Sequence, residues 1–285
     1  MPKRSRSPPR SPRVAPEAAV LPRPKKRLGQ HFLTDRHYLA RIVAEIAPRA
    51  GEAMVEIGPG PGALTEALCA IVQPLHAVEV DRELAEALRG RFPPSALVVH
   101  EGDVLQFDLA TLPAPLRVVG NLPYNVSTPI LFHVARHVAR LSDCTFMLQR
   151  EVVERMVAEP DTPAYGRLSV MLQEQFEMSL AFRVPPGAFT PPPKVESAIV
   201  RLRPRAHDAP RAHDERTFAS VVAAAFSQRR KTLRNALRAL AGEAAFQAAS
   251  IDPSRRGETL SVAEFRRLAD AVACVPGAVL SERAE

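Results

Sequence analysis

The sequence predicts an α/β fold, in which helices cover both faces of a mostly parallel sheet, followed by a small all-helical C-terminal domain. Between residues 36 and 149, short apolar segments typical of buried strands alternate with segments of helical periodicity. From Glu215 onward the periodicity is helical throughout, with breaks near Gly242 and Pro253. Ligands of such sheets bind at the carboxyl ends of the strands, so the segments that follow the strands are the candidate site.

The predicted elements follow one another at short intervals. A first helix is expected over 36–47, because Pro48 and Gly51 end its periodicity. The predicted strands cover 53–58, 75–81, 97–100, Val118–Val119 and 144–149, with helices at 63–72 and 84–88. Prolines at 185–186 and 191–193 exclude a continuous helix or a central strand there, and an alternating strand is expected at 197–202.

Composition narrows the class of protein. A chain of 285 residues with 46% hydrophobic residues can bury a full core. No apolar run approaches the length of a membrane span, so the sequence predicts a soluble, cytoplasmic protein. The three cysteines, Cys69, Cys144 and Cys274, lie far apart without CxxC spacing. This pattern argues against a zinc site or a disulfide framework, so no metal is expected, and it suits a reducing cytosol.

The net charge of +7 favours a polyanionic partner such as a nucleic acid, although a basic protein can simply have a solvated surface. Residues 1–24 are almost entirely Pro, Arg, Ser and Ala and lack the apolar core of a signal peptide. Their prolines oppose the amphipathic helix of an organelle transit peptide. We therefore expect a disordered basic tail that touches phosphates without sequence preference.

A glycine-rich loop, Glu56-Ile57-Gly58-Pro59-Gly60-Pro61-Gly62, joins a predicted strand to a helix. Its glycines, Gly58 and Gly60 among them, allow a tight turn and close approach to a ligand, although such a turn can be purely structural. Glu79 ends the next strand, where an acid would bind ribose hydroxyls, and Asp103 follows the third strand, near an adenine amine. Each acid alone could be a solvated residue. Together, and without a phosphate-binding lysine, the three positions indicate S-adenosylmethionine.

The segment Asn121-Leu122-Pro123-Tyr124 directly follows an apolar strand. The Asn121 amide offers a hydrogen-bond acceptor, and Pro123 fixes the backbone so that neighbouring carbonyls point one way. Tyr124 offers a face for a planar ring. This combination suits a weakly nucleophilic exocyclic base amine, whose two protons would be accepted by Asn121 and by the Leu122 or Pro123 carbonyl. The alternative is an asparagine-proline turn with a core tyrosine.

Cations cluster in a predicted helix over 226–237. Leu233 and Leu237 lie four residues apart and are expected to pack inward, while Arg230 and Arg234 share another face. A charged helix face is often only solvated, but no acid interrupts this cluster, which favours phosphate contacts. The expected contacts are Arg229, Arg230, Lys231 and Arg234, and Arg36, Arg41 and the run Lys25-Lys26-Arg27 could extend the surface.

Four segments together resemble the ribosomal RNA adenine dimethyltransferase family. They are Gly29-Gln30-His31-Phe32-Leu33, Glu56-Ile57-Gly58-Pro59-Gly60, Asn121-Leu122-Pro123-Tyr124-Asn125 and Phe189-Thr190-Pro191-Pro192-Pro193-Lys194-Val195. The resemblance runs from about Lys25 to Val272, with every motif in the family's order. It implies a Rossmann-like class I S-adenosylmethionine-dependent methyltransferase sheet over 25–204 and a helical RNA-binding domain over 205–275, with a flexible tail at 276–285.

The resemblance is greatest to family members that act on the small ribosomal subunit. It implies methyl transfer to the N6 of two adjacent adenosines near the 3′ end of 16S rRNA, within the 30S subunit or its precursor, as a step of ribosome biogenesis. The product is N6,N6-dimethyladenosine, and a monomer is the default expectation. The resemblance further implies roles for individual residues.

By this resemblance His31 and Leu33 lie against the cofactor, Gly58 contacts its methionine part, Glu79 its ribose and Asp103 its adenine. Asn121 touches both the cofactor and the target. Phe189 forms the other face of a base clamp opposite Tyr124. Many family members carry asparagine where this chain has His31, so a backbone contact is expected at that position.

Three alternatives remain open at this point. A 23S rRNA adenine dimethyltransferase is disfavoured by the segments 189–195 and 228–237. A non-catalytic RNA-binding assembly or transcription factor on the same fold could tolerate changes at Gly58, Glu79 or Asn121, and none is present. A DNA adenine methyltransferase would be expected to carry a separate sequence-reading domain, for which the C-terminal region is too small and too uniformly basic.

Overall fold

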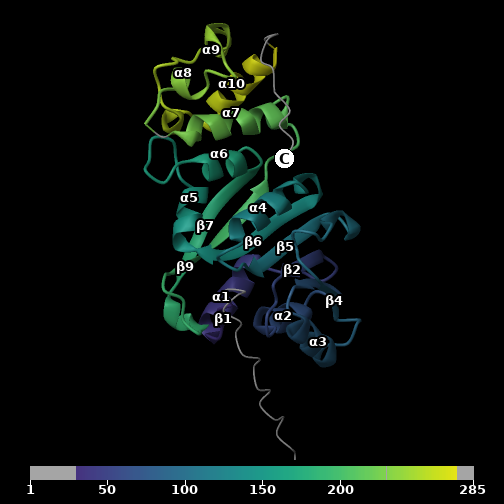
Figure 1. Ribbon diagram of the computed structural model, residues 1–285. Coiled ribbons are helices and arrows are strands. Elements are labelled where there is room, and N and C mark those ends of the chain that lie inside the picture. The colour runs from purple at the N-terminus through teal and green to yellow at the C-terminus, as the bar shows by residue number, and fades with distance from the viewer. Residues whose placement is uncertain (1–29, 229, 275–285) are drawn as a thin grey trace, which may run out of the picture.

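The computed structural model describes residues 30–228 and 230–274, and a seven-stranded sheet forms its centre (Figure 1). The strand order is β4-β3-β2-β5-β6-β9-β7, and a separate two-stranded sheet joins β1 to β8. The strands are β1 Phe32–Leu33, β2 Ala53–Ile57, β3 Leu75–Glu79, β4 Leu97–Glu101, β5 Leu116–Asn121, β6 Leu141–Gln149, β7 Phe176–Val184, β8 Phe189–Thr190 and β9 Ser197–Pro204.

Helices connect the strands and pack on both faces of the sheet. They are α1 Arg36–Ile46, α2 Ala63–Cys69, α3 Arg82–Arg91, α4 Ser127–Ala135, α5 Arg150–Met156, α6 Arg167–Gln173, α7 Glu215–Ser227, α8 Leu233–Ala236, α9 Glu243–Ala249 and α10 Val262–Cys274. None of the helices within the described ranges is long and apolar enough to cross a membrane.

The five strands from β4 to β6 run parallel, which confirms the predicted α/β class. Because they are parallel, the segments that follow β2, β3, β4 and β5 meet at one edge of the sheet. The antiparallel strand β9 lies between β6 and β7. Its first four residues are all buried, so the alternating strand expected at 197–202 is instead covered on both faces. Strand β7 was not predicted.

A buried arginine ties the first helix to the sheet at the end opposite these segments. The Arg117 side chain, in β5, donates to both carboxylate oxygens of Asp143 in β6, at 2.7 and 3.0 Å, and to Glu52 at 2.7 Å. It also donates to the carbonyls of Ile46 and Ala47, where α1 ends. Arg201 of β9 donates to Asp143 at 2.6 Å. Burial alone would raise the pKa of Asp143, but hydrogen bonds from the two arginines lower it, so the carboxylate stays charged.

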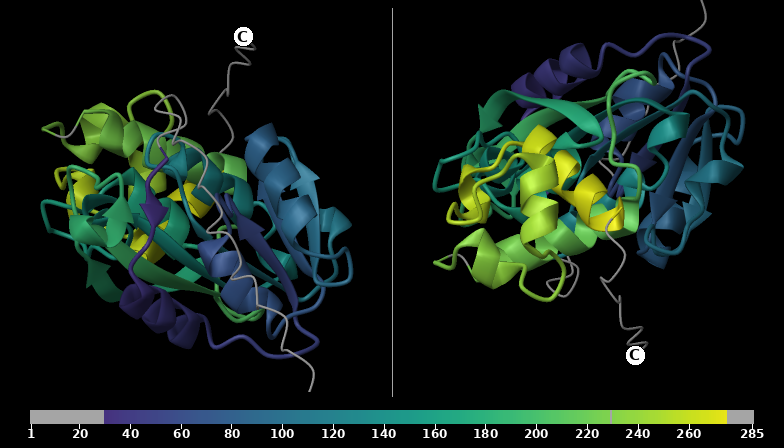
Figure 2. Two further views of the ribbon diagram at one scale, coloured as in Figure 1. Left: turned by 90° about the horizontal axis from the view of Figure 1, so that it is seen from below. Right: turned by 90° about the horizontal axis from the view of Figure 1, so that it is seen from above.

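Helices α7 to α10 share a second hydrophobic cluster, which also takes in Tyr165 and Val170 of the preceding region. The Tyr165 hydroxyl donates to the Leu260 carbonyl at 2.9 Å, and Arg266 of α10 pairs with Glu174 at 2.9 Å. In Figure 1 these helices occupy the top of the molecule, away from β1 and α1. Seen from above, the C-terminal helices lie nearest the viewer (Figure 2). The boundaries at 204 and 275 stay predictions.

The prediction of a single basic helix over 226–237 is wrong. Helix α7 ends at Ser227, Gln228 has a non-helical backbone, and a new short helix, α8, begins at Leu233. Thr232 caps α8 in an extended conformation, while the Leu233 amide donates to the Arg255 carbonyl. A run of like charges disfavours continuation of the helix. Leu233 and Leu237 are both fully buried, as predicted. The break in the helix is what lets both side chains reach the core.

Candidate functional site

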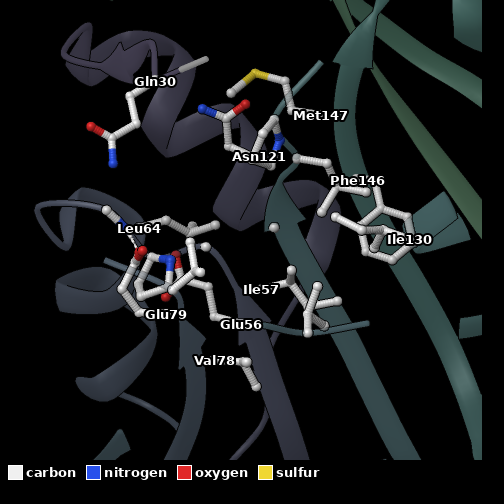
Figure 3. A pocket seen from close by; sticks show the side chains of 18 of the residues that line it. Gln30, Glu56, Ile57, Leu64, Val78, Glu79, Asn121, Ile130, Phe146 and Met147 are labelled. Carbon is white, nitrogen blue, oxygen red and sulfur yellow. Dashed lines mark hydrogen bonds between the residues drawn. The ribbon is translucent and has the colours of Figure 1, made fainter. Parts of the chain in front are cut away.

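A cavity of about 300 Å³ lies where the carboxyl ends of β2, β3 and β5 meet (Figure 3). Its walls come from the glycine loop, from the ends of these strands and from the segment that contains β1. The predicted site residues that line it are His31, Leu33, Gly58, Gly60, Glu79, Asp103, Asn121, Leu122, Pro123 and Tyr124. In Figure 3 Glu56 and Glu79 lie together on one side of the cavity, and Asn121 lies across from them.

The glycine loop brings its backbone to the cavity in a conformation that favours glycine. Gly58 and Gly60 have φ angles of 65° and 58°. The Gly58 amide donates to the Val78 carbonyl at 2.9 Å, which holds the start of the loop against β3. A Cβ on Gly60 would lie 3.3 Å from the Phe32 ring of β1. The loop is therefore packed between β3 and the N-terminal segment and presents main chain to any ligand.

Glu79 is a buried carboxylate that organises this loop. One of its oxygens accepts from the Gly60 amide at 3.0 Å and the other from the Asp81 amide at 2.8 Å. Burial raises the pKa of Glu79, although these hydrogen bonds oppose the rise. Each carboxylate oxygen can accept a second hydrogen bond, so the group can also take hydroxyl donors from a ligand.

Glu56 is a second buried acid at the cavity, to which sequence reasoning assigned no role. It is 2% exposed, and its carboxylate accepts from the Thr65 hydroxyl at 2.7 Å. Burial, opposed by the Thr65 hydrogen bond and assisted by the nearby Glu79, raises the pKa of Glu56 to about 7. The sequence signal was an acid inside an apolar strand directly before the glycine loop.

Asp103 and Val80 form the outer side of the cavity. The Asp103 side chain is exposed and accepts from the Leu105 amide at 2.9 Å, which leaves acceptor capacity on the carboxylate. Val80, directly after Glu79, is 54% exposed, one of the few large apolar side chains that face outward in the described ranges. Sequence reasoning missed it, because a strand-end valine is usually buried. It offers an apolar face to a flat ring between Glu79 and Asp103.

Asn121 ends β5 with its amide fixed. The side-chain nitrogen donates to the His31 carbonyl at 3.0 Å, so the amide oxygen is left as the acceptor, as the proposed contact with a base amine requires. The preceding residue, Gly120, has no room for a side chain, since a Cβ there would lie 2.4 Å from the Ile57 carbonyl oxygen. The strand ends of β2 and β5 therefore touch at this point.

The structure brings Tyr124 together with His31 and not with Phe189. The Tyr124 ring stacks on the His31 ring, with centroids 5.6 Å apart, and its hydroxyl hydrogen-bonds to Ser197 Oγ at 2.6 Å. Burial raises the pKa of Tyr124, so the phenol stays protonated. Phe189 is 3% exposed, packs in the core with Met147 and Ile199, and is not among the residues that line the cavity.

The predicted phosphate contacts lie far from the cavity, in the group of C-terminal helices (Figure 1). Arg230 and Lys231 are exposed between α7 and α8. Arg234 is exposed on α8 and pairs with Glu243 at 3.2 Å. Arg229 and the run 25–27 lie outside the described residues. On α1, Arg41 is exposed with its guanidinium stacked 4.0 Å from the Phe182 ring, and Arg36 is exposed near the start of the helix.

These features fit a nucleoside ligand that carries a charged substituent. Carboxylates at Glu79 and Asp103 can accept from ribose hydroxyls and from a base amine, and Val80 lies between them. Because Gly58 has no side chain, the main chain of the glycine loop can approach the rest of the ligand closely. Burial opposes the charged forms of Glu56 and Glu79, and a ligand that carries positive charge would favour their ionisation. The residues present therefore fit S-adenosylmethionine, and the same cavity reaches Asn121 and Tyr124.

Comparison with known proteins supports this assignment from sequence. A family model described as ribosomal RNA adenine dimethylase matches residues 22–273. The chain is 56% identical over 251 residues to the ribosomal RNA small subunit methyltransferase A of Aromatoleum aromaticum, covering 88% of this chain and 95% of the relative. It is 55% identical over 245 residues to the protein of the same name from Thiobacillus denitrificans, covering 86% and 96%.

Solved structures share the fold. A dimethyladenosine transferase from Plasmodium falciparum superposes with a TM-score of 0.72 at 22% identity, covering 84% of this chain and 96% of that one. The 23S rRNA methyltransferase ErmE superposes with a TM-score of 0.65 at 27% identity, covering 85% and 99%. These matches confirm the predicted methyltransferase sheet.

Gly120→Ala should lower both stability and ligand binding. Its new methyl group meets the rigid main chain of Ile57, so β2 and β5 must separate, and we expect a loss of about 1–3 kcal/mol in the free energy of unfolding. Chemical denaturation measures the loss, and equilibrium dialysis with labelled S-adenosylmethionine measures binding. Gly90→Ala is the matched control, since nothing lies within 4 Å of a Cβ at that helix position. Equal stability of the two variants would contradict the proposed contact.

Glu56→Gln should become more stable than the natural protein as the pH rises. The folded protein holds the Glu56 proton until about pH 7, whereas the unfolded chain releases it near pH 4.5. Stability from this group is therefore complete below pH 4.5 and is lost as the pH rises through 7, by about 3 kcal/mol, while glutamine does not ionise. Urea denaturation at pH 5 and pH 8 measures the difference, with the exposed Glu86→Gln as control. A difference that does not change with pH would refute the burial argument.

Proposed function

Because the chain belongs to the ribosomal RNA adenine dimethylase family, we propose that it methylates the small-subunit ribosomal RNA with S-adenosylmethionine as donor. Its target is the N6 of two adjacent adenosines near the 3′ end of 16S rRNA, and its product is N6,N6-dimethyladenosine. Four methyl transfers are implied, so the site must accept a monomethylated amine as well as a free one.

The choice of the small-subunit RNA is supported by the relatives named above. They match more than four fifths of the chain at more than half identity, and their names state a small-subunit target. The solved 23S rRNA methyltransferase is 27% identical, so its likeness to this chain is much lower.

The fixed amide of Asn121 is the observation that supports the chemistry. The adenine N6 lone pair is delocalised into the ring, which makes the amine a weak nucleophile. If the Asn121 oxygen and the Leu122 or Pro123 carbonyl accept its two protons, the nitrogen is drawn towards tetrahedral geometry. The His31 carbonyl holds the amide in the orientation that this requires, at no cost during the reaction. Catalysis is then positioning and electrostatics.

The remaining cavity residues hold the donor, which supplies an electrophilic methyl group when bound. Glu79 accepts from the ribose hydroxyls, Asp103 accepts from the adenine amine, and Val80 packs on the adenine ring. Gly58 and Gly60 leave room for the methionine part beside the loop. His31 contributes its carbonyl and Leu33 an apolar wall.

Binding of the RNA is assigned to the C-terminal helices. Arg229, Arg230, Lys231 and Arg234 would contact phosphates, and the exposure of the last three suits that role. Helix α8, which carries Arg234, and strand β1, whose residues line the cavity, lie at different ends of the molecule (Figure 1). An RNA that engages both must be large and folded, which supports a 30S subunit or its precursor as the substrate. The protein acts as a monomer and in the cytoplasm in this proposal.

Methylation of isolated particles tests the function directly. Purified protein with labelled S-adenosylmethionine should label 30S particles from cells that lack the modification, and digestion should release N6,N6-dimethyladenosine. Label only in 23S rRNA, only in DNA, or nowhere would refute the assignment. Heat-extracted 16S rRNA without ribosomal proteins serves as the control and should be labelled less than the particle.

Asn121→Ala separates the amide's role from cofactor binding. The variant should lose 30S methylation by a factor of about 100 or more, because an acceptor for the amine is removed from a site that excludes water. Binding of labelled cofactor should stay measurable by equilibrium dialysis. Turnover equal to that of the natural protein would contradict the proposed role of the amide.

A further inference from the structure

The His31 ring covers one face of Tyr124, the residue on which the proposed function stacks the target base. The two rings are tilted by 26°, with centroids 5.6 Å apart, and both residues line the cavity. A base sandwiched between two rings holds them roughly 7 Å apart, because each of the two stacked contacts needs about 3.5 Å between carbon atoms. No flat ring fits between His31 and Tyr124 in this arrangement.

Three contacts hold the His31 residue in place. Its Nδ1 lies 2.9 Å from the Pro191 carbonyl oxygen, and because that oxygen can only accept, Nδ1 carries the proton and donates. Its own carbonyl accepts from Asn121, and the next residue, Phe32, pairs with Thr190 in the β1–β8 sheet. Only the contact with Pro191 involves the ring. The ring can therefore turn away while the main chain keeps its contact with Asn121.

The same contact joins the N-terminal segment to the loop that carries Phe189. Leu33 pairs with Phe189, and the amides of Thr34 and Asp35 both donate to the Ala188 carbonyl. Phe189 itself is buried in the core. The Thr34 hydroxyl also hydrogen-bonds to the Ala188 carbonyl and to the Thr190 hydroxyl, both at 3.3 Å. A base that displaces the His31 ring from Tyr124 would break the hydrogen bond from His31 to Pro191 and leave these other contacts in place.

We propose that the His31 ring holds the place of the target base on Tyr124 and leaves when the adenine enters. This inference rests on the proposed function, since it takes Tyr124 as the stacking surface for the base. His31 is then a positioning residue. It keeps the aromatic surface covered until an RNA base competes for Tyr124, and its departure releases the Pro191 carbonyl while the main-chain contacts of the loop remain.

Substitutions at position 31 test the exchange of rings. In His31→Ala no ring has to leave Tyr124 before the base binds. We therefore expect kcat/KM for 30S particles to rise by about five-fold, which corresponds to the energy of one aromatic pair, and we expect the rise to come from a lower KM. In His31→Phe an apolar ring remains on Tyr124, and kcat/KM should fall below that of the alanine variant and of the natural protein. His37→Ala is the matched control, because His37 packs against Tyr38 on α1 outside the cavity and should leave kcat/KM unchanged.

A fall of kcat/KM in His31→Ala, with cofactor affinity retained, would show that the ring supports the base and would overturn the proposal. A phenylalanine variant faster than the alanine variant would do the same. Cofactor affinity is measured by equilibrium dialysis, so that a general loss of the site is recognised. Inactivity of the natural protein on 30S particles would instead contradict the proposed function.

Nuclear magnetic resonance tests the stack without any turnover. In protein labelled at histidine Cε1, the His31 signal, identified by its loss in His31→Gln, should show an upfield shift from the Tyr124 ring. Tyr124→Leu should remove that shift and leave the His37 signal unchanged. A His31 signal that is the same in Tyr124→Leu and in the natural sequence would show that the rings do not stack in solution and would overturn the proposal, whatever the methylation assay shows.

Discussion

At the carboxyl ends of β2 and β5 the two backbones lie so close that position 120 has no space for a side chain. A Cβ there would meet the Ile57 carbonyl at 2.4 Å, and a Cβ on Gly58, the residue that follows β2, would lie 3.9 Å from the Asn121 carbonyl. This contact sets the glycine loop against the segment that begins with Asn121. The Leu122 amide then donates to Met147 of β6, so the segment leaves the strand on a fixed path. One close approach thus places the cofactor loop and the base-binding residues in a single cavity.

The cavity also holds two buried acids, Glu56 and Glu79, whose charged forms are opposed by burial. Within the described ranges their hydrogen-bond partners are the Thr65 hydroxyl and main-chain amides, and no salt bridge joins either acid to a cation. Elsewhere the protein handles a buried acid differently, since Asp143 has two arginines. The contrast indicates that the cavity is built for a positively charged ligand, whose binding would offset the desolvation of the two acids. The sulfonium and ammonium groups of S-adenosylmethionine meet that description.

The sequence was sufficient where local patterns determine structure. The strand–glycine loop–helix unit, Glu79 and Asp103 were placed correctly because parallel strands bring their carboxyl ends to one edge, whatever the details of packing. It was insufficient where tertiary contacts override local preference. The predicted helix over 226–237 breaks because the Leu233 and Arg234 amides donate hydrogen bonds to the Arg255 and Pro253 carbonyls, which no periodicity reveals. Strand β7 was missed because its pattern mixes buried and exposed residues without strict alternation.

The contacts that the sequence could not show are those that control access to Tyr124. Strands β1 and β8 have two residues each, too short for any pattern, and they join segments that lie about 160 positions apart. The resemblance placed Phe189 against Tyr124, but in the structure Phe189 is buried and His31 is there instead. The His31 main chain positions Asn121 while its ring covers Tyr124, so one residue contacts both the fixed amide and the aromatic surface of the cavity.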